Sequence, residues 1–326
     1  MPKKYIIIII AALVAIIIGV CFAVALGGQE SPNADLQAGK SAQEPFCLLV
    51  LGKDKVSGLT DVMMLVAFDT SRDRICVMQI PRDTYADYGS SAHKKLNTAT
   101  KILGGEEELC EFLSGALGIG IDGYLSLELE GFRKAVDAIG GVEIDLPAAL
   151  DYEDPEQNLY IHLPAGKQIL DGKKAEMVVR FRDGYARGDL DRLDMQKRFL
   201  AALFAKLKTE LTAANAYKLA TSVFPHVRTN VSLPMAVALG LEAIKVDNSS
   251  LVFLTLPGED VVSDKSGASY YVMSLTPTEA VLREYFSMND IRVDEKSLFK
   301  HPTNKKFSDI YYKDFEYSVV FADKFG

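Results

Sequence analysis

Histidine and cysteine, which often bind catalytic metals or act in catalytic triads, are scarce: the 326 residues contain four of each. The histidines are scattered along the chain, at His93, His162, His226 and His301, and the sequence lacks the H-E-x-x-H, C-x-x-C, G-x-S-x-G and Walker A motifs. These absences argue against zinc enzymes and histidine-dependent triads. Four cysteines also do not make a disulfide framework in a domain of this size. Cys47 and Cys76 fall in strand-like segments, where either one bridge or two buried thiols would fit.

An excess of positive charge is also missing. The formal net charge is −8, which opposes generic binding to nucleic acid or to anionic lipid. One segment reverses this balance, because residues 173–198 contain eight cations and five acids. Such a local reversal indicates a focused anion-binding site.

Charge is absent altogether from residues 5–26, a run dominated by Ile, Ala and Val. Crossing a membrane takes roughly 20 apolar residues, so this run predicts a transmembrane helix. Lys3 and Lys4 precede it, and the positive-inside rule then leaves residues 1–4 in the cytoplasm and the C-terminal domain outside. A cleaved signal peptide is the alternative, but its apolar region is about 7–15 residues long, shorter than this run. We therefore expect a single-pass protein of the cell membrane, with residues 27–45 as a flexible polar linker.

Apolar runs and helical periodicity predict mixed strands and helices in the remainder. We expect strands at residues 46–51, 61–68, 74–80, 124–129, 142–146, 176–182 and 251–256. We expect helices at residues 106–116, 130–139, 189–208, 213–224, 233–244 and 277–286. This pattern indicates an α/β domain over residues 46–286, in αβα layers around a central mixed sheet. Residues 287–326 form a C-terminal extension that the pattern does not place.

A glycine-rich motif of the dinucleotide-binding type occurs in the wrong structural context. Residues 118–123 match G-x-G-x-x-G, but the match closes a predicted helix and precedes a strand. A dinucleotide fingerprint has the opposite order, so this segment is predicted to be a loop.

Candidate chemistry begins at the ends of the first predicted strands. Asp54 and Asp61 lie a short loop apart, where two carboxylates can share a hard cation such as Mg²⁺, although acids in a loop are usually solvated. Pro81 ends a strand, and Arg82 follows it at the carboxyl end, where open α/β sheets place ligands. Arg82 and Lys95 are each either surface cations or phosphate ligands.

Arg180 and Arg182 are spaced by two in the predicted strand at residues 176–182. That spacing puts both guanidinium groups on one face, with Phe181 on the other face toward the core. Either an anion meets them, or they protect an exposed sheet edge from pairing.

Asp189, Arg192 and Gln196 lie at offsets of three and four and therefore share one stripe of the predicted helix at 189–208. A solvated face with an ion pair would give the same spacing. Taken together, the guanidinium groups, the lysine and the carboxylates suit a pyrophosphate bound with Mg²⁺.

These segments, in this order, resemble the LytR-CpsA-Psr family of cell-envelope glycopolymer ligases. The matching segments are LLVLGKD…TD, IPRDTY, KKLN, GFRKAVDAIGGVEIDLP, GKQILDGKKA and VVRFRDG…GDLDRLDMQKR. The resemblance implies an α/β fold and a Mg²⁺-dependent phosphotransferase that moves a glycopolymer from a polyprenyl-pyrophosphate carrier to peptidoglycan. It implies that Asp54 and Asp61 hold Mg²⁺ and that Arg82, Arg180 and Arg182 contact the pyrophosphate. Lys95, Asp189, Arg192 and Gln196 would complete the site.

Two positions depart from the family pattern. Leu59-Thr60 precede Asp61 and Met195 precedes Gln196, where family members often carry arginine. Both departures remove positive charge and favour an alternative function, a non-catalytic envelope protein that binds the lipid carrier or the glycan. A transcriptional regulator is disfavoured, because no basic helix suits a DNA groove. In the enzyme, an acceptor hydroxyl would attack the glycan-side phosphorus, and Asp61 or another nearby carboxylate would take its proton.

Overall fold

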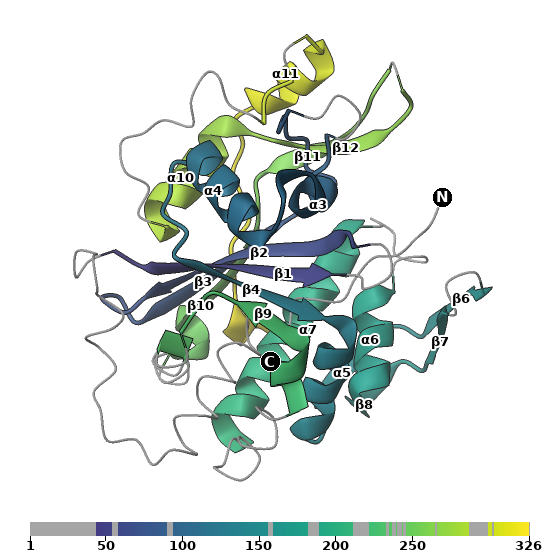
Figure 1. The fold of residues 1–326 in the computed structure, drawn as a ribbon. Helices are drawn as coiled ribbons and strands as arrows, with labels where there is room; N and C mark the ends of the chain where they lie inside the picture. The colour runs from purple at the N-terminus through teal and green to yellow at the C-terminus, as the bar shows by residue number, and fades with distance from the viewer. Residues whose placement is uncertain are drawn as a thin grey trace.

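The computed structural model describes residues 44–53, 58–89, 94–155, 159–181, 189–210, 222–232, 235–236, 239, 243, 246–264, 266–286, 299–301 and 303–325. Its centre is a seven-stranded sheet in the order β13-β10-β3-β2-β1-β4-β9 (Figure 1). The strands are β1 (Phe46–Lys53), β2 (Thr60–Asp69), β3 (Arg74–Ile80), β4 (Gly123–Glu128), β9 (Val227–Thr229), β10 (Leu251–Thr255) and β13 (Val320–Phe321).

The sheet is mixed, and its directions define one functional edge. β1 is antiparallel to β2 and parallel to β4. β3 is antiparallel to β2 and parallel to β10. The carboxyl ends of β1, β3, β4 and β10 therefore meet at one edge of the sheet, beside the start of β2. This edge, called the site edge below, is where open α/β sheets bind ligands.

Both faces of the sheet are buried, because alternate residues of each central strand enter different cores. On β1, Leu48 and Val50 pack in one core, whereas Cys47, Leu49 and Leu51 pack in the other. A strand buried on both faces is apolar throughout, which is why these runs were recognisable in the sequence.

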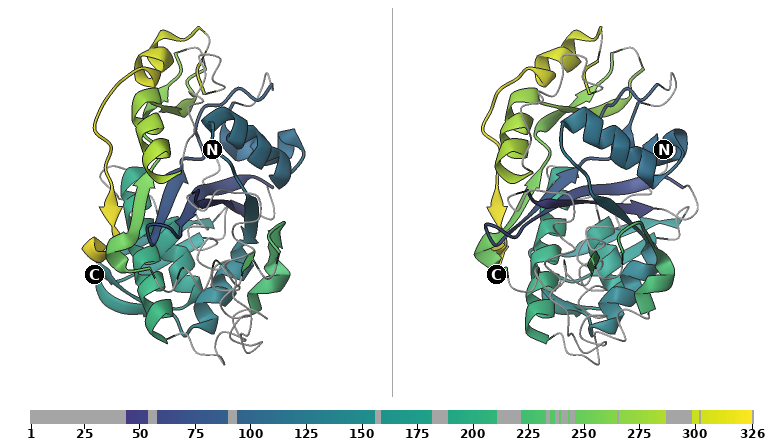
Figure 2. Two further views of the ribbon diagram at one scale, coloured as in Figure 1. Left: turned by 90° about the vertical axis from the view of Figure 1, so that its left-hand side faces the viewer. Right: turned by 60° about the vertical axis from the view of Figure 1, so that its left-hand side comes forward.

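Helices cover the two faces, as Figures 1 and 2 show. The first core contains side chains of α5 (Leu129–Ala138), α6 (Gly172–Arg180) and α7 (Asp189–Glu210). The second contains side chains of α3 (Ala99–Leu103), α4 (Glu106–Leu117), α10 (Leu275–Tyr285) and α11 (Lys305–Tyr311). The predicted α/β class with a central mixed sheet is confirmed.

Three two-stranded sheets complete the fold. They are β5 (Val142–Leu146) with β8 (Gly166–Leu170), β6 (Leu150–Asp154) with β7 (Leu159–Leu163), and β11 (Gly258–Val262) with β12 (Ser269–Met273). The loop at residues 118–123 is also confirmed: Gly118 ends α4 with a left-handed φ of 65°, and β4 begins at Gly123.

The strand predicted at residues 176–182 is wrong. Residues Gly172–Arg180 form helix α6, and the Asp171 side chain caps it by accepting a hydrogen bond of 2.8 Å from the Lys174 backbone N–H. The buried residues Ala175, Val178 and Val179 are spaced as one helical face, not as one face of a strand. The wrong prediction arose because the β-branched pair Val178-Val179 is typical of a strand. Most of the helices predicted at 213–224 and 233–244 lies outside the described residues.

The described part of the C-terminal segment packs against the rest of the chain. β13 pairs with β10 in the central sheet, and the side chains of Phe299, Phe307 and Tyr311 are buried in the second core. Of the cysteines, the structure describes Cys47, Cys76 and Cys110 as buried free thiols, so the possible bridge between the first two is not formed.

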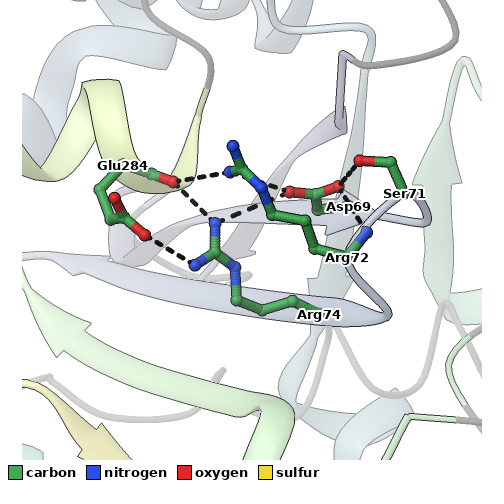
Figure 3. A network of polar contacts seen from close by, with 5 residues as sticks. All are labelled: Asp69, Ser71, Arg72, Arg74 and Glu284. Carbon is green, nitrogen blue, oxygen red and sulfur yellow. Dashed lines mark hydrogen bonds and ion pairs between the residues drawn. The ribbon is translucent and has the colours of Figure 1, made fainter.

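An ion-pair network fastens the β2–β3 hairpin to the carboxyl end of α10, at the edge of the sheet opposite the site edge (Figure 3). Arg74 donates from Nη1 to the Glu284 carboxylate at 2.9 Å and from Nη2 to the Glu284 backbone carbonyl at 2.7 Å. Asp69 lies 3.4 Å from Arg72 and 3.6 Å from Arg74. Arginine at a helix carboxyl end satisfies carbonyls that the helix leaves unpaired.

Within the described ranges, no helix combines the length and hydropathy that a membrane crossing requires. The predicted anchor at residues 5–26 lies outside those ranges.

Candidate functional site

Asp61 lies at the site edge as the extra residue of a β-bulge. Lys53 of β1 pairs with Thr60 of β2, whereas Gly52 pairs with Val62, so Asp61 has no opposite residue on β1. A bulge re-aims a side chain locally and is common beside active sites. The bulge separates the Asp61 carboxylate from the regular alternation of the strand.

Arg82 meets Asp61 directly beyond the end of β3. The Arg82 Nη1 atom lies 3.3 Å from Asp61 Oδ1, and the two side chains are only 8% and 2% exposed. The structure thus brings together two of the predicted site residues as a buried ion pair. A buried carboxylate and guanidinium need each other, because either charge alone would be costly to bury.

The segment after β3 is held on both sides by backbone hydrogen bonds. The Tyr271 N–H of β12 donates to the Asp83 carbonyl at 2.9 Å, and the Tyr85 N–H donates to the Tyr271 carbonyl at 2.8 Å. On the other side, the Leu96 N–H donates to the Thr84 carbonyl at 3.0 Å, and the Asn97 N–H donates to the Arg82 carbonyl at 3.0 Å. Residues 81–85 are therefore a fixed support for their side chains.

Lys95 belongs to the same group. Its Nζ lies 3.1 Å from Asp83 Oδ1 and 5.4 Å from the centre of the Tyr270 ring. Asp83 in turn lies 4.0 Å from Arg82 Nε. Two predicted phosphate ligands, Arg82 and Lys95, therefore flank the carboxylate of Asp83, which was not among the predicted site residues.

Gln196 is buried where α6, α7 and β3 meet. Its Nε2 donates to the Val179 carbonyl at 3.0 Å, and Gln79 Nε2 donates to Gln196 Oε1 at 3.4 Å. These bonds join the end of α6 to the end of β3. The binding role predicted for Gln196 stays a prediction.

The structure contradicts the predicted position of Arg180 in a strand. Arg180 ends helix α6 and does not lie in a strand, and Arg182 lies outside the described residues. Arg180 Nη1 donates to Glu176 Oε1 at 2.6 Å, and Arg133 Nη1 of α5 lies 3.3 Å from Glu176 Oε2. The carboxylate partner is thus one helical turn away, an i,i+4 neighbour that becomes evident once the segment is read as a helix. Phe181 is buried, as predicted.

For several predicted site residues, the structure describes neither the side chain nor its contacts. Asp54 and Arg182 lie outside the described residues, and for Asp189 and Arg192 only the backbone in α7 is described. Met195, where the family often carries arginine, is 4% exposed and packs in the first core. Its apolar side chain therefore contributes to packing at that position.

A second ion pair borders the site edge. Lys53 Nζ, at the end of β1, lies 2.8 Å from Glu106 Oε1 in the first turn of α4. Burial raises the pKa of the Glu106 carboxyl, but the hydrogen bond and charge of Lys53, together with further hydrogen bonds that include Ser126, bring the pKa below its ordinary value. Beside this pair, the Thr60 and Thr100 hydroxyls are 2.9 Å apart.

The donor set fits a magnesium ion that is completed by phosphate oxygens. Among the described residues, no three of His, Cys, Asp and Glu are grouped as a complete metal cage. Mg²⁺ takes one or two protein carboxylates and fills its other positions with phosphate and water. Asp61 supplies one such carboxylate at the site edge, and Arg82 and Lys95 supply the cations that phosphate oxygens prefer.

Comparisons with known proteins identify the family of the chain. The model of the LytR_cpsA_psr family matches residues 24–286. The chain is 27% identical over 253 residues to TagV of Bacillus subtilis (strain 168), a polyisoprenyl-teichoic acid–peptidoglycan teichoic acid transferase. That match covers 73% of this chain and 63% of TagV, which is less than two thirds of the relative's length.

A second relative and a solved structure support the same family assignment. TagU of Halalkalibacterium halodurans, a transferase with the same descriptive name, is 29% identical over 212 residues, covering 63% of this chain and 67% of TagU. The crystal structure of B. subtilis TagV superimposes with a TM-score of 0.64 at 26% identity, covering 76% of this chain and 99% of that chain. The family model matches most of the sequence, and the chain therefore belongs to the LytR-CpsA-Psr family.

Proposed function

We propose that this protein is a phosphotransferase that moves a glycopolymer, together with its phosphate, from a polyprenyl-pyrophosphate carrier to peptidoglycan outside the membrane. The observation that carries the proposal is the buried pair of Asp61 and Arg82, 3.3 Å apart at the site edge with Lys95 beside it. The names of the related transferases TagV and TagU support the same reaction.

The residues have separate roles in this reaction. Arg82 and Lys95, with Arg180 and Arg182, bind the pyrophosphate oxygens and stabilise the charge that spreads over them during transfer. Asp189, Arg192 and Gln196 complete the binding site. Asp61, with Asp54, would hold Mg²⁺, which neutralises phosphate charge when it is bound. An acceptor hydroxyl attacks the glycan-side phosphorus, and polyprenyl phosphate leaves.

The sequence supports a reaction at the outer face of the cell membrane. Residues 5–26 anchor the chain in the cell membrane, and residues 27–45 tether the domain on the outer side. A lipid-linked donor lies in the same membrane, so the tether keeps the site close to it.

The alternative is a non-catalytic envelope protein that binds the carrier or the glycan. The pairing of Arg180 with Glu176 favours it, because an internal carboxylate already neutralises one of the predicted phosphate ligands. Binding without transfer would identify this alternative.

The test compares the wild-type chain with Asp61→Asn. Both are incubated with a synthetic short-chain polyprenyl-pyrophosphate disaccharide, peptidoglycan oligomers and Mg²⁺, and products are measured by mass spectrometry. We expect transfer by the wild type and at least a hundredfold loss in Asp61→Asn, with the circular dichroism spectrum unchanged. Equal transfer by both chains would exclude Asp61 from the reaction.

A further inference from the structure

We propose that Asp83 is the general base that takes the proton of the acceptor hydroxyl, an inference that rests on the proposed function. Asp83 lies on the fixed segment after β3, between Arg82 and Lys95. From Pro81 to Ala86 every residue is buried except Asp83, whose side chain is 32% exposed. The fold thus presents the Asp83 carboxylate to solvent between Arg82 and Lys95.

Three other described carboxylates near the site edge or in its ion pairs are more deeply buried than Asp83. Asp61 is 2% exposed and paired with Arg82. Glu106 is 10% exposed and paired with Lys53, and Glu176 is 10% exposed between Arg133 and Arg180. A base must reach an incoming hydroxyl, so exposure separates Asp83 from these three groups.

The ion pairs of Asp83 with Arg82 and Lys95 involve one of its two carboxylate oxygens. Arg82 Nε and Lys95 Nζ both approach the same oxygen, Oδ1, at 4.0 Å and 3.1 Å. These contacts orient the carboxylate, and Oδ2 is the oxygen that can accept a hydrogen bond from a hydroxyl. The Tyr271 N–H donates to the Asp83 carbonyl and the Tyr85 N–H donates to the Tyr271 carbonyl, and these two bonds fix the backbone that carries the carboxylate.

The acceptor oxygen forms a bond to the glycan-side phosphorus, while the bond from that phosphorus to the bridging oxygen breaks. The bridging oxygen leaves with the electron pair as part of polyprenyl phosphate. The hydroxyl proton passes to Asp83 Oδ2 and then to water.

The experiment uses the full chain with three variants: Asp83→Asn, Asp83→Ala and the control Asp87→Asn. Asp87 pairs with Lys94 between the same two chain segments but is not part of the proposed machinery. Affinity for the short-chain polyprenyl-pyrophosphate disaccharide is measured by calorimetry, and transfer to peptidoglycan oligomers by mass spectrometry. Melting temperatures are measured for all chains.

We expect Asp83→Asn to bind the donor within about threefold of the wild type but to transfer it about a hundred to ten thousand times more slowly. Added formate should restore part of the rate of Asp83→Ala, because it replaces the missing carboxylate. Asp87→Asn should bind and transfer normally.

Transfer by Asp83→Asn within fivefold of the wild type would overturn the assignment. So would a parallel loss of donor affinity and transfer, because Asp83 would then act only by positioning Arg82 and Lys95. If Asp83→Asn melts early, the formate response of Asp83→Ala, compared with its own rate without formate, decides between the outcomes. Failure of the wild type itself to transfer would instead refute the proposed function.

Discussion

Glu176 is the residue that ties Arg180 to the rest of the fold. The Glu176 side chain is 10% exposed and contacts Arg180 and Arg133 at 2.6 and 3.3 Å. Arg180→Ala should therefore lower the free energy of unfolding by about 1.5–3 kcal/mol, because a largely buried carboxylate loses a charged hydrogen bond. Urea denaturation measures this change.

The matched control is Lys134→Ala. Lys134 makes an i,i+4 contact of 3.9 Å with Glu130, and both side chains are nearly half exposed. Its loss should change stability by no more than about 0.5 kcal/mol. Equal effects of the two substitutions would mean that the Glu176–Arg180 pair is not a buried interaction in solution.

Glu106 predicts a pH dependence of stability. Burial raises its folded pKa, but the contacts with Lys53 and the other hydrogen bonds to the carboxyl together bring the pKa below the ordinary value. The contribution is complete above the unfolded pKa of about 4.3 and is lost as pH falls through the lower, folded pKa. The stability difference between wild type and Glu106→Gln should therefore be constant near neutral pH and shrink below about pH 4. A difference that stays constant from neutral pH to pH 3 would contradict the pairing.

At the residue scale, the sequence predicted which side chains lie at the site edge better than it predicted the residues that these side chains contact. Asp61 was chosen as a carboxylate a short loop away from Asp54, and Arg82 because it follows a strand end. The structure brings both of them, with Lys95, to one edge of the sheet. The bond between Gln79 and Gln196 joins residues 117 positions apart, and local spacing carries no information about it. Glu176 was missed because its segment was predicted to be a strand, whereas it forms helix α6.

At the element scale, α6 shows how a local pattern misleads. The sequence Val178-Val179-Arg180-Phe181 has the β-branched and aromatic residues of a strand, and this composition led to the wrong assignment. The start signal of a helix was also present, since Asp171 stands three residues before Lys174. Read as a helix, the segment predicts the contact between Glu176 and Arg180 directly.

Arg74 should stabilise α10 without affecting chemistry. It donates to the Glu284 carbonyl and carboxylate, at the edge of the sheet opposite the site edge. Arg74→Ala should cost about 1–2 kcal/mol of stability because a helix carboxyl end loses its arginine. Arg72→Ala should cost less, since Arg72 is 60% exposed and its contact with Asp69 is 3.4 Å. Thermal melts measure both changes, and transfer at 25 °C should stay normal; reduced transfer by folded Arg74→Ala would contradict the separation of the two edges.

At the scale of the whole molecule, the buried strands made the α/β class predictable, because a sheet covered on both faces requires apolar runs. The strand order was not predictable, since the pairing of β10 with β3 and of β13 with β10 joins distant segments. Burial determines which segments are strands, while tertiary packing determines their neighbours.

The membrane topology is a prediction of the same scale. A reporter enzyme that is active only outside the cell, fused after Gly326, should be active because two lysines precede the apolar run at residues 5–26. A cytoplasmic reporter at the same place should be silent. The reverse pattern would place the domain on the side where peptidoglycan is absent.

The central claim concerns the bond that breaks, and the lipid product tests it most directly. After incubation of the full chain with the short-chain polyprenyl-pyrophosphate disaccharide and peptidoglycan oligomers, mass spectrometry identifies both products. Phosphotransfer predicts polyprenyl monophosphate as the released lipid and a peptidoglycan product heavier by the disaccharide and one phosphate. Release of polyprenyl pyrophosphate, with sugar attached to peptidoglycan without phosphate, would contradict the account.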